Sequence, residues 1–196
     1  MAALTAAARD RTDNSPTGLV WRTMAAELSQ LGDPAPVHAA RVPVCDWLAR
    51  SAPEPSAAGA QTALLTVLLN VLPRLAWARN SGYCNEDFLN RYGYCELVGD
   101  GPWPSSRVRV GVLLLAPHTH YSLHAHPAEE IYWLLGGAAH WWVGSDAPRE
   151  MVSGDTVHHP STVAHAMRTA AAPLLALYCW CGAIAAPAQL LEGTNE

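Results

Sequence analysis

The hydrophobic pattern changes its period part-way along the chain. In residues 1–106 apolar side chains recur at helical spacing, whereas from Arg107 onward they fall into short extended runs. The segment up to about Pro16 is alanine-rich and polar, and we expect a frayed end there. The pattern therefore predicts a helical region, 1–106, packed on a β-rich region, 107–196, in one compact domain.

The front region contains several helical signals separated by turn residues. Residues 17–31 repeat apolar positions at helical spacing and run into a Gly-Asp-Pro turn. Residues 61–79 are so apolar that a helix there needs a buried face, and Pro73 should kink or restart it. A loop is expected at 52–59. Helices are predicted at 17–31, 42–50, 61–79 and 85–94.

The back region reads as a series of short strands with turn residues between them. The runs are RVRVGVLLLAP, EIYWLLGG, AAHWWVGS, DTVHHP, HAMRT and LLALYCWCG. This arrangement is typical of a small antiparallel β-barrel. About a hundred front residues exceed what a bare barrel requires, so the helices should either cover the barrel mouth or form the interface of a homodimer.

Composition narrows the classes of partner and the cellular compartment. The net charge is −5 and no basic run occurs, which argues against nucleic acid or an anionic membrane surface as a partner. No targeting segment is evident, and the longest apolar run is too short to span a bilayer. Five cysteines without framework spacing indicate free thiols, many of them buried, in a reducing compartment. We expect a cytoplasmic protein.

Candidate chemistry concentrates in residues 118–137, which read HTHYSLHAHPAEEIYWLLGG. His124, His126 and Glu130 give the spacing H-x-H-x-x-x-E, and imidazole with carboxylate suits a divalent metal such as Zn, Fe, Mn, Co or Ni. Residues two apart on a strand share a face, so the histidine pair can hold one ion, and Glu130 can join it after a bend. Tyr132 keeps this parity, which predicts a phenol directed at the same ion.

A second histidine-containing stretch, 154–165, reads GDTVHHPSTVAH. Its candidate ligand is His165, whereas His158 and His159 are expected to serve packing or a hydrogen bond. Together the two stretches resemble the two conserved sequence blocks of the cupin family. The matching residues are His124, His126, Glu130, Gly137, Gly154, Pro160 and His165. This resemblance implies a mainly β protein with a single cupin barrel that binds a metal.

Two tyrosines narrow the resemblance. The run YSLHAHPAEEIYWLL, followed by HP-x4-H and preceded by a helical region, resembles the cupin dimethylsulfoniopropionate (DMSP) lyases of the DddQ type. The resemblance implies that His126, Glu130 and His165 bind the metal, with His124 as a further ligand or close neighbour. It also implies that Tyr132 is the catalytic base, with a phenol that can also coordinate the metal. Tyr121 would hold substrate or assist proton transfer, and Trp180 would lie beside the substrate.

The chemistry of such a lyase is consistent with these residues. The substrate is a sulfonium carboxylate, and a metal that takes the carboxylate acidifies the adjacent C–H bond. A tyrosinate removes that proton, and the β-carbon expels dimethyl sulfide and leaves acrylate. One divalent transition metal suffices and no organic cofactor is needed. Eight Trp and six Tyr suit a pocket for a cationic sulfonium group.

Two other classes of function share the same ligand set. One is a cupin Fe(II)-dependent oxygenase that acts on a small molecule, which needs open metal positions but no proton-abstracting Tyr132. The other is a non-catalytic cupin that binds a small molecule. The sequence favours the lyase because of its tyrosines.

Overall fold

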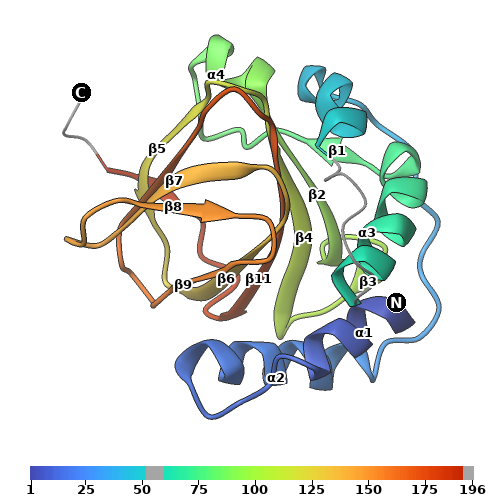
Figure 1. Ribbon diagram of the computed structural model, residues 1–196. Helices are drawn as coiled ribbons and strands as arrows, with labels where there is room; N and C mark the ends of the chain where they lie inside the picture. Colours follow the sequence, from blue (N-terminus) through green and yellow to red (C-terminus); the bar gives the residue numbers. More distant parts are fainter. Residues whose placement is uncertain (52–59, 192–196) are drawn as a thin grey trace.

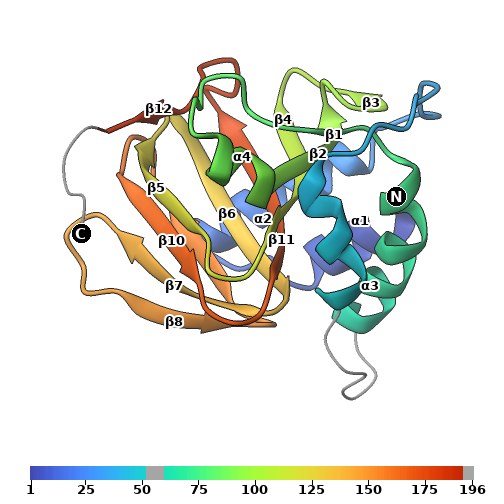
Figure 2. The same cartoon turned by 90° about the horizontal axis from the view of Figure 1, so that it is seen from above.

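Two β-sheets face each other to form a small barrel, and helices lie against one side of it (Figures 1 and 2). The computed structural model describes residues 1–51 and 60–191. The α-helices are α1 (Ala2–Arg9), α2 (Pro16–Leu28), α3 (Ala60–Val71) and α4 (Glu86–Arg91), and the 3-10 helices are η1 (Pro43–Arg50) and η2 (Leu72–Arg74). This architecture confirms the predicted fold class, a mainly β cupin barrel with helices at the N-terminal end.

The sheets are antiparallel apart from the edge pair of β2 with β3. The larger sheet has the strand order β1-β2-β4-β11-β6-β9, with β3 beside β2, and the smaller sheet has the order β12-β5-β10-β7-β8. The strands are β1 (Trp77–Ala78), β2 (Tyr92–Gly99), β3 (Trp103–Pro104), β4 (Val108–Leu115), β5 (His120–Ala125), β6 (Ala128–Gly136), β7 (Ala138–Val143), β8 (Arg149–Val152), β9 (Thr156–His159), β10 (His165–Thr169), β11 (Leu174–Gly182) and β12 (Gln189–Leu190).

Both faces of the larger sheet are covered. On β11, Leu177 and Cys179 belong to an apolar cluster shared with helices α1, α2 and α3. The alternate residue Tyr178 belongs to a second cluster inside the barrel, together with Trp141 and Met167 of the smaller sheet. Because both faces are buried, the strands of this sheet are almost continuously apolar, and the two-residue alternation that marks a half-exposed strand is weak.

Helix α2 begins and packs as its sequence predicts. Ser15 caps it, with its Oγ accepting a hydrogen bond from the backbone N–H of Gly18 at 3.0 Å, and Pro16 occupies the first turn. Trp21 contacts Trp133 of β6 edge to face, with the ring centroids 5.8 Å apart. The predicted helix 17–31 is therefore confirmed, although it ends at Leu28.

The predicted helix 61–79 is only partly present. Helix α3 ends at Val71, and η2 and β1 follow, because Pro73 lacks an amide hydrogen and cannot continue the α-helical ladder. The buried residues of α3, Leu64 and Leu68 among them, belong to the apolar cluster on the outer face of the larger sheet. Gln61 Nε2 donates to Ser153 Oγ at 2.9 Å, which ties the start of α3 to the barrel.

Other front-region predictions need correction. Residues 2–9 are not a frayed end, since α1 buries Leu4 and Ala8 against the other helices. The predicted helix 85–94 stops at Arg91 and passes directly into β2, so strands of the barrel begin before residue 107. The 42–50 helix is the 3-10 helix η1. The predicted loop 52–59 lies outside the described residues.

The helices α1, α2 and α3 lie along the outer face of the larger sheet rather than across the barrel mouth, with α2 below the barrel and α3 to its right in Figure 1. A homodimer and the division of the chain near residue 106 stay predictions. None of the described helices is long and apolar enough to cross a membrane. All five cysteines are free, and four of them are buried, as predicted.

A fragment that begins at Arg107 should aggregate or fail to fold. It would lack β2 and the helices, so the apolar outer face of the larger sheet, including Leu177 and Trp133, would meet water. Size-exclusion chromatography and circular dichroism of the fragment beside the full chain test this. A monomeric fragment with native β-signal would show that the front region is dispensable for folding.

Candidate active site

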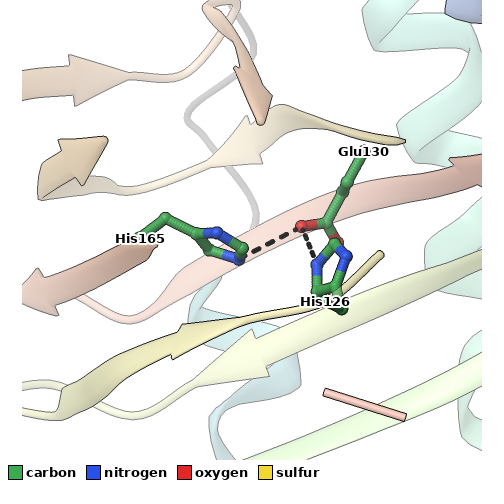
Figure 3. A group of neighbouring side chains, drawn as sticks. All are labelled: His126, Glu130 and His165. Atoms are coloured by element: carbon green, nitrogen blue, oxygen red, sulfur yellow. Dashed lines mark hydrogen bonds and ion pairs between the residues drawn. The ribbon is translucent and has the colours of Figure 1, made fainter. Parts of the chain in front are cut away.

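Three buried side chains from separate parts of the barrel converge on one point (Figure 3). His126 directly follows β5, Glu130 lies near the start of β6, and His165 is the first residue of β10. Their ligand atoms all lie within 4.8 Å of one another. Glu130 Oε2 is 3.1 Å from His126 Nε2 and 3.5 Å from His165 Nε2, and the close-up shows both rings turned toward that carboxylate.

The two histidine rings are oriented by hydrogen bonds on their outer nitrogens. His126 Nδ1 donates to the carbonyl of Ala128 at 2.9 Å, and His165 Nδ1 donates to the carbonyl of Val163 at 2.9 Å. When the proton of such a ring is on Nδ1 alone, the lone pair of Nε2 points inward, as metal binding requires. Among the described residues, His165 Nε2 is buried without a hydrogen-bond partner. Two imidazoles and a carboxylate with converging lone pairs fit a single divalent transition metal.

His124 stands beside this group rather than within it. Its ring is stacked on Tyr121, with centroids 4.3 Å apart at 11°, and lies edge-on to His165 at 4.2 Å. The centroid of His126 is 6.4 Å away. The structure thus places His124 as a close neighbour of the three convergent residues, and its part in coordination stays a prediction.

His159 belongs to the site, although the sequence indicated only packing or a hydrogen bond. Trp141 Nε1 donates to His159 Nε2 at 2.8 Å, so the proton of the ring is on Nδ1, which donates to Glu130 Oε2 at 2.8 Å. The ring also stacks on His165 at 3.7 Å. His159 pairs with Glu130 across β9 and β6, a register that only the folded sheet supplies.

Trp180 fixes the other carboxylate oxygen. Its Nε1 donates to Glu130 Oε1 at 2.5 Å, and its ring is stacked on His126 at 4.0 Å. Burial acts to raise the pKa of Glu130, but the contacts with His126 and His159 outweigh it and hold that pKa below its usual range. The carboxylate is therefore charged at neutral pH, as a metal ligand must be.

Burial favours the neutral form of three histidines at the site. It lowers the pKa of His124 to about 4, and it lowers the pKa values of His159 and His165 as well. Neutral imidazoles are the form that binds a metal. At pH 7 these three neutral imidazoles thus lie around one negative carboxylate.

These pKa shifts predict that the metal-free protein loses stability in acid. Below pH 6.5 the unfolded chain takes up protons that the buried imidazoles do not, so the free energy of unfolding is greatest above pH 6.5 and falls as the pH drops toward 4. His124 alone should contribute about 3 kcal/mol to this loss once its titration is complete. Urea unfolding between pH 8 and pH 4 measures it. His140→Asn, at an exposed imidazole, should leave the profile unchanged, whereas a flat profile in the unaltered protein would contradict the prediction.

A cavity of about 250 Å³ opens beside the carboxylate of Glu130. Tyr132 lies two residues further along β6, on the same inner face, and both Tyr132 and Tyr121 line the cavity with Trp180. Tyr83 Oη donates to Tyr121 Oη at 3.0 Å. The parity predicted for Tyr132 is thus present, and the three predicted substrate-side aromatic residues border one space.

The charge and burial around Tyr132 oppose ionisation. Burial first, and then the charge of Glu130, raise the pKa of the Tyr132 phenol well above its ordinary value. Burial likewise raises the pKa of Tyr121. These side chains alone therefore keep both phenols neutral, and a phenolate at this position requires a positive charge close by.

Comparisons of the sequence and of the structure with known proteins point to one family. The dimethylsulfoniopropionate lyase family model matches residues 19–176. Dimethylsulfoniopropionate lyase DddQ of Ruegeria pomeroyi is 39% identical over 97 residues, which cover 49% of this chain and 48% of that protein, so the match spans about half of the relative's length.

Solved structures agree over most of the chain. The crystal structure of DMSP lyase DddQ from Ruegeria pomeroyi superposes with a TM-score of 0.73 at 29% identity, covering 85% of this chain and 87% of the other. A structure described under the DMSP lyases RdDddP and RnDddQII superposes with a TM-score of 0.78 at 31% identity, covering 97% and 98%. The chain belongs to the dimethylsulfoniopropionate lyase family.

Proposed function

We propose that this protein is a metal-dependent carbon–sulfur lyase that cleaves dimethylsulfoniopropionate into dimethyl sulfide and acrylate. The observation that carries the proposal is the cavity bordered by both Tyr132 and Glu130, since Glu130 is the carboxylate of the convergent group with His126 and His165. Membership of the DMSP lyase family supports the choice of substrate.

The metal would be held by His126, Glu130 and His165, with His124 as a further ligand or close neighbour. When bound, one divalent transition metal (Zn, Fe(II), Mn, Co or Ni) supplies a Lewis acid for the substrate carboxylate and a positive charge near Tyr132. No organic cofactor takes part. His159 and Trp180 hold the Glu130 carboxylate in place through a hydrogen bond to each of its oxygens.

Tyr132 would act as the general base. Its phenol is buried and borders the cavity, and burial and the charge of Glu130 raise its pKa. The positive charge of a bound metal would therefore have to favour the phenolate. The phenolate oxygen takes the proton from the carbon next to the substrate carboxylate. The electron pair of that C–H bond becomes the new double bond, the C–S bond breaks, and dimethyl sulfide leaves as a neutral molecule.

Tyr121 and Trp180 would hold the substrate. Tyr121 is fixed by the hydrogen bond from Tyr83 and by stacking on His124, which leaves its ring on the wall of the cavity. Trp180 is fixed by Glu130 and His126 and borders the same space. Electron-rich ring faces attract a sulfonium group, most strongly where water is excluded.

The decisive experiment is release of dimethyl sulfide by purified protein, measured by gas chromatography with each of the five metals in turn, in air and under nitrogen. We expect release in both atmospheres with at least one metal. Oxygen uptake with no release under nitrogen would assign the protein to the Fe(II) oxygenases. Binding of the substrate with no turnover under any metal would leave a non-catalytic binding protein.

A further inference from the structure

The wall of the cavity away from the metal group carries a second carboxylate, Glu96. Glu96 lies on β2, in the same cross-strand row of the larger sheet as Tyr132 of β6. Gly111 of β4 and Tyr178 of β11 occupy the two positions between them. Both Glu96 and Glu130 line the cavity. Their strands are three spacings apart, about 14 Å along the sheet, which leaves room for a short ligand between the two side chains.

Glu96 shares its cationic partner, Arg109, with a second carboxylate, Asp100. Arg109 is closest to the exposed Asp100, at 2.7 Å, and its other nitrogen is 3.5 Å from Glu96 Oε2. The Tyr178 hydroxyl is also 3.5 Å from Oε2, while the backbone N–H of Asp100 donates to Oε1 at 2.5 Å. Two carboxylates thus share one guanidinium, so the cluster of Glu96, Asp100 and Arg109 carries a net charge of −1, and both Glu96 and Arg109 line the cavity.

Low solvent exposure strengthens the electrostatic field of Glu96 inside the cavity. The Glu96 side chain is 11% exposed, against 78% for Asp100, so water screens Glu96 far less. Burial raises the pKa of the Glu96 carboxyl despite Arg109 and the backbone hydrogen bond. A cation in the cavity would offset the lost hydration of this carboxylate.

The sheet has a specific feature that brings an aromatic ring to Glu96. A Cβ atom at position 111 would collide with the Tyr178 hydroxyl and with the ring carbon that bears it, so Gly111 is what allows Tyr178 to lie across β4. The hydroxyl of Tyr178 thereby faces Glu96, and the ring joins Tyr94 and Trp180 in the cavity wall.

We propose that Glu96 is a specificity-determining residue that makes the cavity select a ligand with a permanent positive charge at the end opposite its carboxylate. This inference rests on the proposed function for the identity of the substrate. One end of such a ligand lies at the group of His126, Glu130 and His165. The onium end lies among Tyr94, Tyr178 and Trp180, where the field of Glu96 adds to the attraction of the ring faces.

The experiment compares two ligands of the same shape that differ only in charge. 3-(Trimethylammonio)propionate carries a quaternary ammonium, and 4,4-dimethylpentanoate has a neutral carbon in its place. Isothermal titration calorimetry on the metal-loaded protein gives the ratio of their dissociation constants. We expect a preference for the cation in the unaltered protein, and Glu96→Gln should reduce that preference about tenfold, which corresponds to about 1.4 kcal/mol.

Two further variants distinguish an effect of the buried Glu96 charge from an effect of the net charge of the protein. Asp146→Asn removes an exposed carboxylate in the turn after β7, outside the ion cluster of Glu96, and should leave the preference nearly unchanged. Arg109→Gln removes the shared cation and should increase the preference at pH 8, which keeps the inference testable if Glu96→Gln does not fold. An unchanged ratio in folded Glu96→Gln, or an equal loss in Asp146→Asn, would overturn the inference.

The outcome separates this inference from the lyase proposal. Release of dimethyl sulfide with no effect of Glu96→Gln on the ligand ratio would retain the lyase and reject the role of Glu96. Loss of cation preference in Glu96→Gln, in a protein that releases no dimethyl sulfide, would retain the role of Glu96 and reject the lyase.

Discussion

Tyr132→Phe should lower the rate of dimethyl sulfide release by about 10²- to 10⁴-fold, the usual contribution of a positioned general base. The substitution removes one oxygen and retains the ring, which packs in the cluster inside the barrel. The metal residues His126, Glu130 and His165 are untouched, so metal content should stay close to that of the unaltered protein. In the unaltered enzyme the rate should rise with pH until the phenol is ionised, and this rise should be absent in the variant.

The test is an anaerobic assay of the two proteins side by side at equal metal occupancy. Tyr92→Phe is the matched control, because Tyr92 is another buried phenol that lines the cavity, on β2 rather than beside Glu130 on β6. It should remain close to the unaltered rate. A Tyr132→Phe variant as fast as the unaltered enzyme would exclude this phenol as the base.

Chelation should abolish activity, and re-addition of a divalent transition metal should restore it. Replacing His126, Glu130 or His165 by Ala should lower metal content and rate together, since each removes one of three convergent side chains proposed to hold the metal. The loss should exceed the ~10- to 100-fold that typically follows removal of a hydrogen-bond partner of a ligand, which is the effect expected for His159→Ala.

Elemental analysis beside the activity assay checks this prediction. His140→Ala is the matched control, because it deletes an exposed imidazole on β7 that is not part of the convergent group. Full activity in protein shown to be free of metal would contradict a metal-dependent mechanism. Normal metal content in all three alanine variants would place the metal elsewhere.

Most of the candidate site was predictable because its residues are close in sequence. His126, Glu130 and Tyr132 lie on either side of one bend between β5 and β6, and a strand presents every second residue to the same face. The resemblance to a family added His165, which lies far along the chain. Its position beside the others follows from the pairing of His165 with His124 across β10 and β5.

The errors in the front region have a common physical cause. Residues 92–99 form a strand whose two faces are both covered, by the helices and by the barrel interior, so the alternation that identifies a strand is weak there. Helix α1 is rich in alanine, and its sequence alone does not reveal that Leu4 and Ala8 meet a partner surface. Burial by distant elements, rather than local preference, decides both segments.

The barrel, the spacing of the candidate ligands and the parity of Tyr132 with Glu130 follow from the amino-acid sequence, because they depend on local geometry and on patterns within short stretches. The contacts of His159 and Trp180 with Glu130, and the position of Glu96 on the same cavity, appear only in the folded protein. The reason is that these residues meet across neighbouring strands, and strand register is set by packing over the whole sheet.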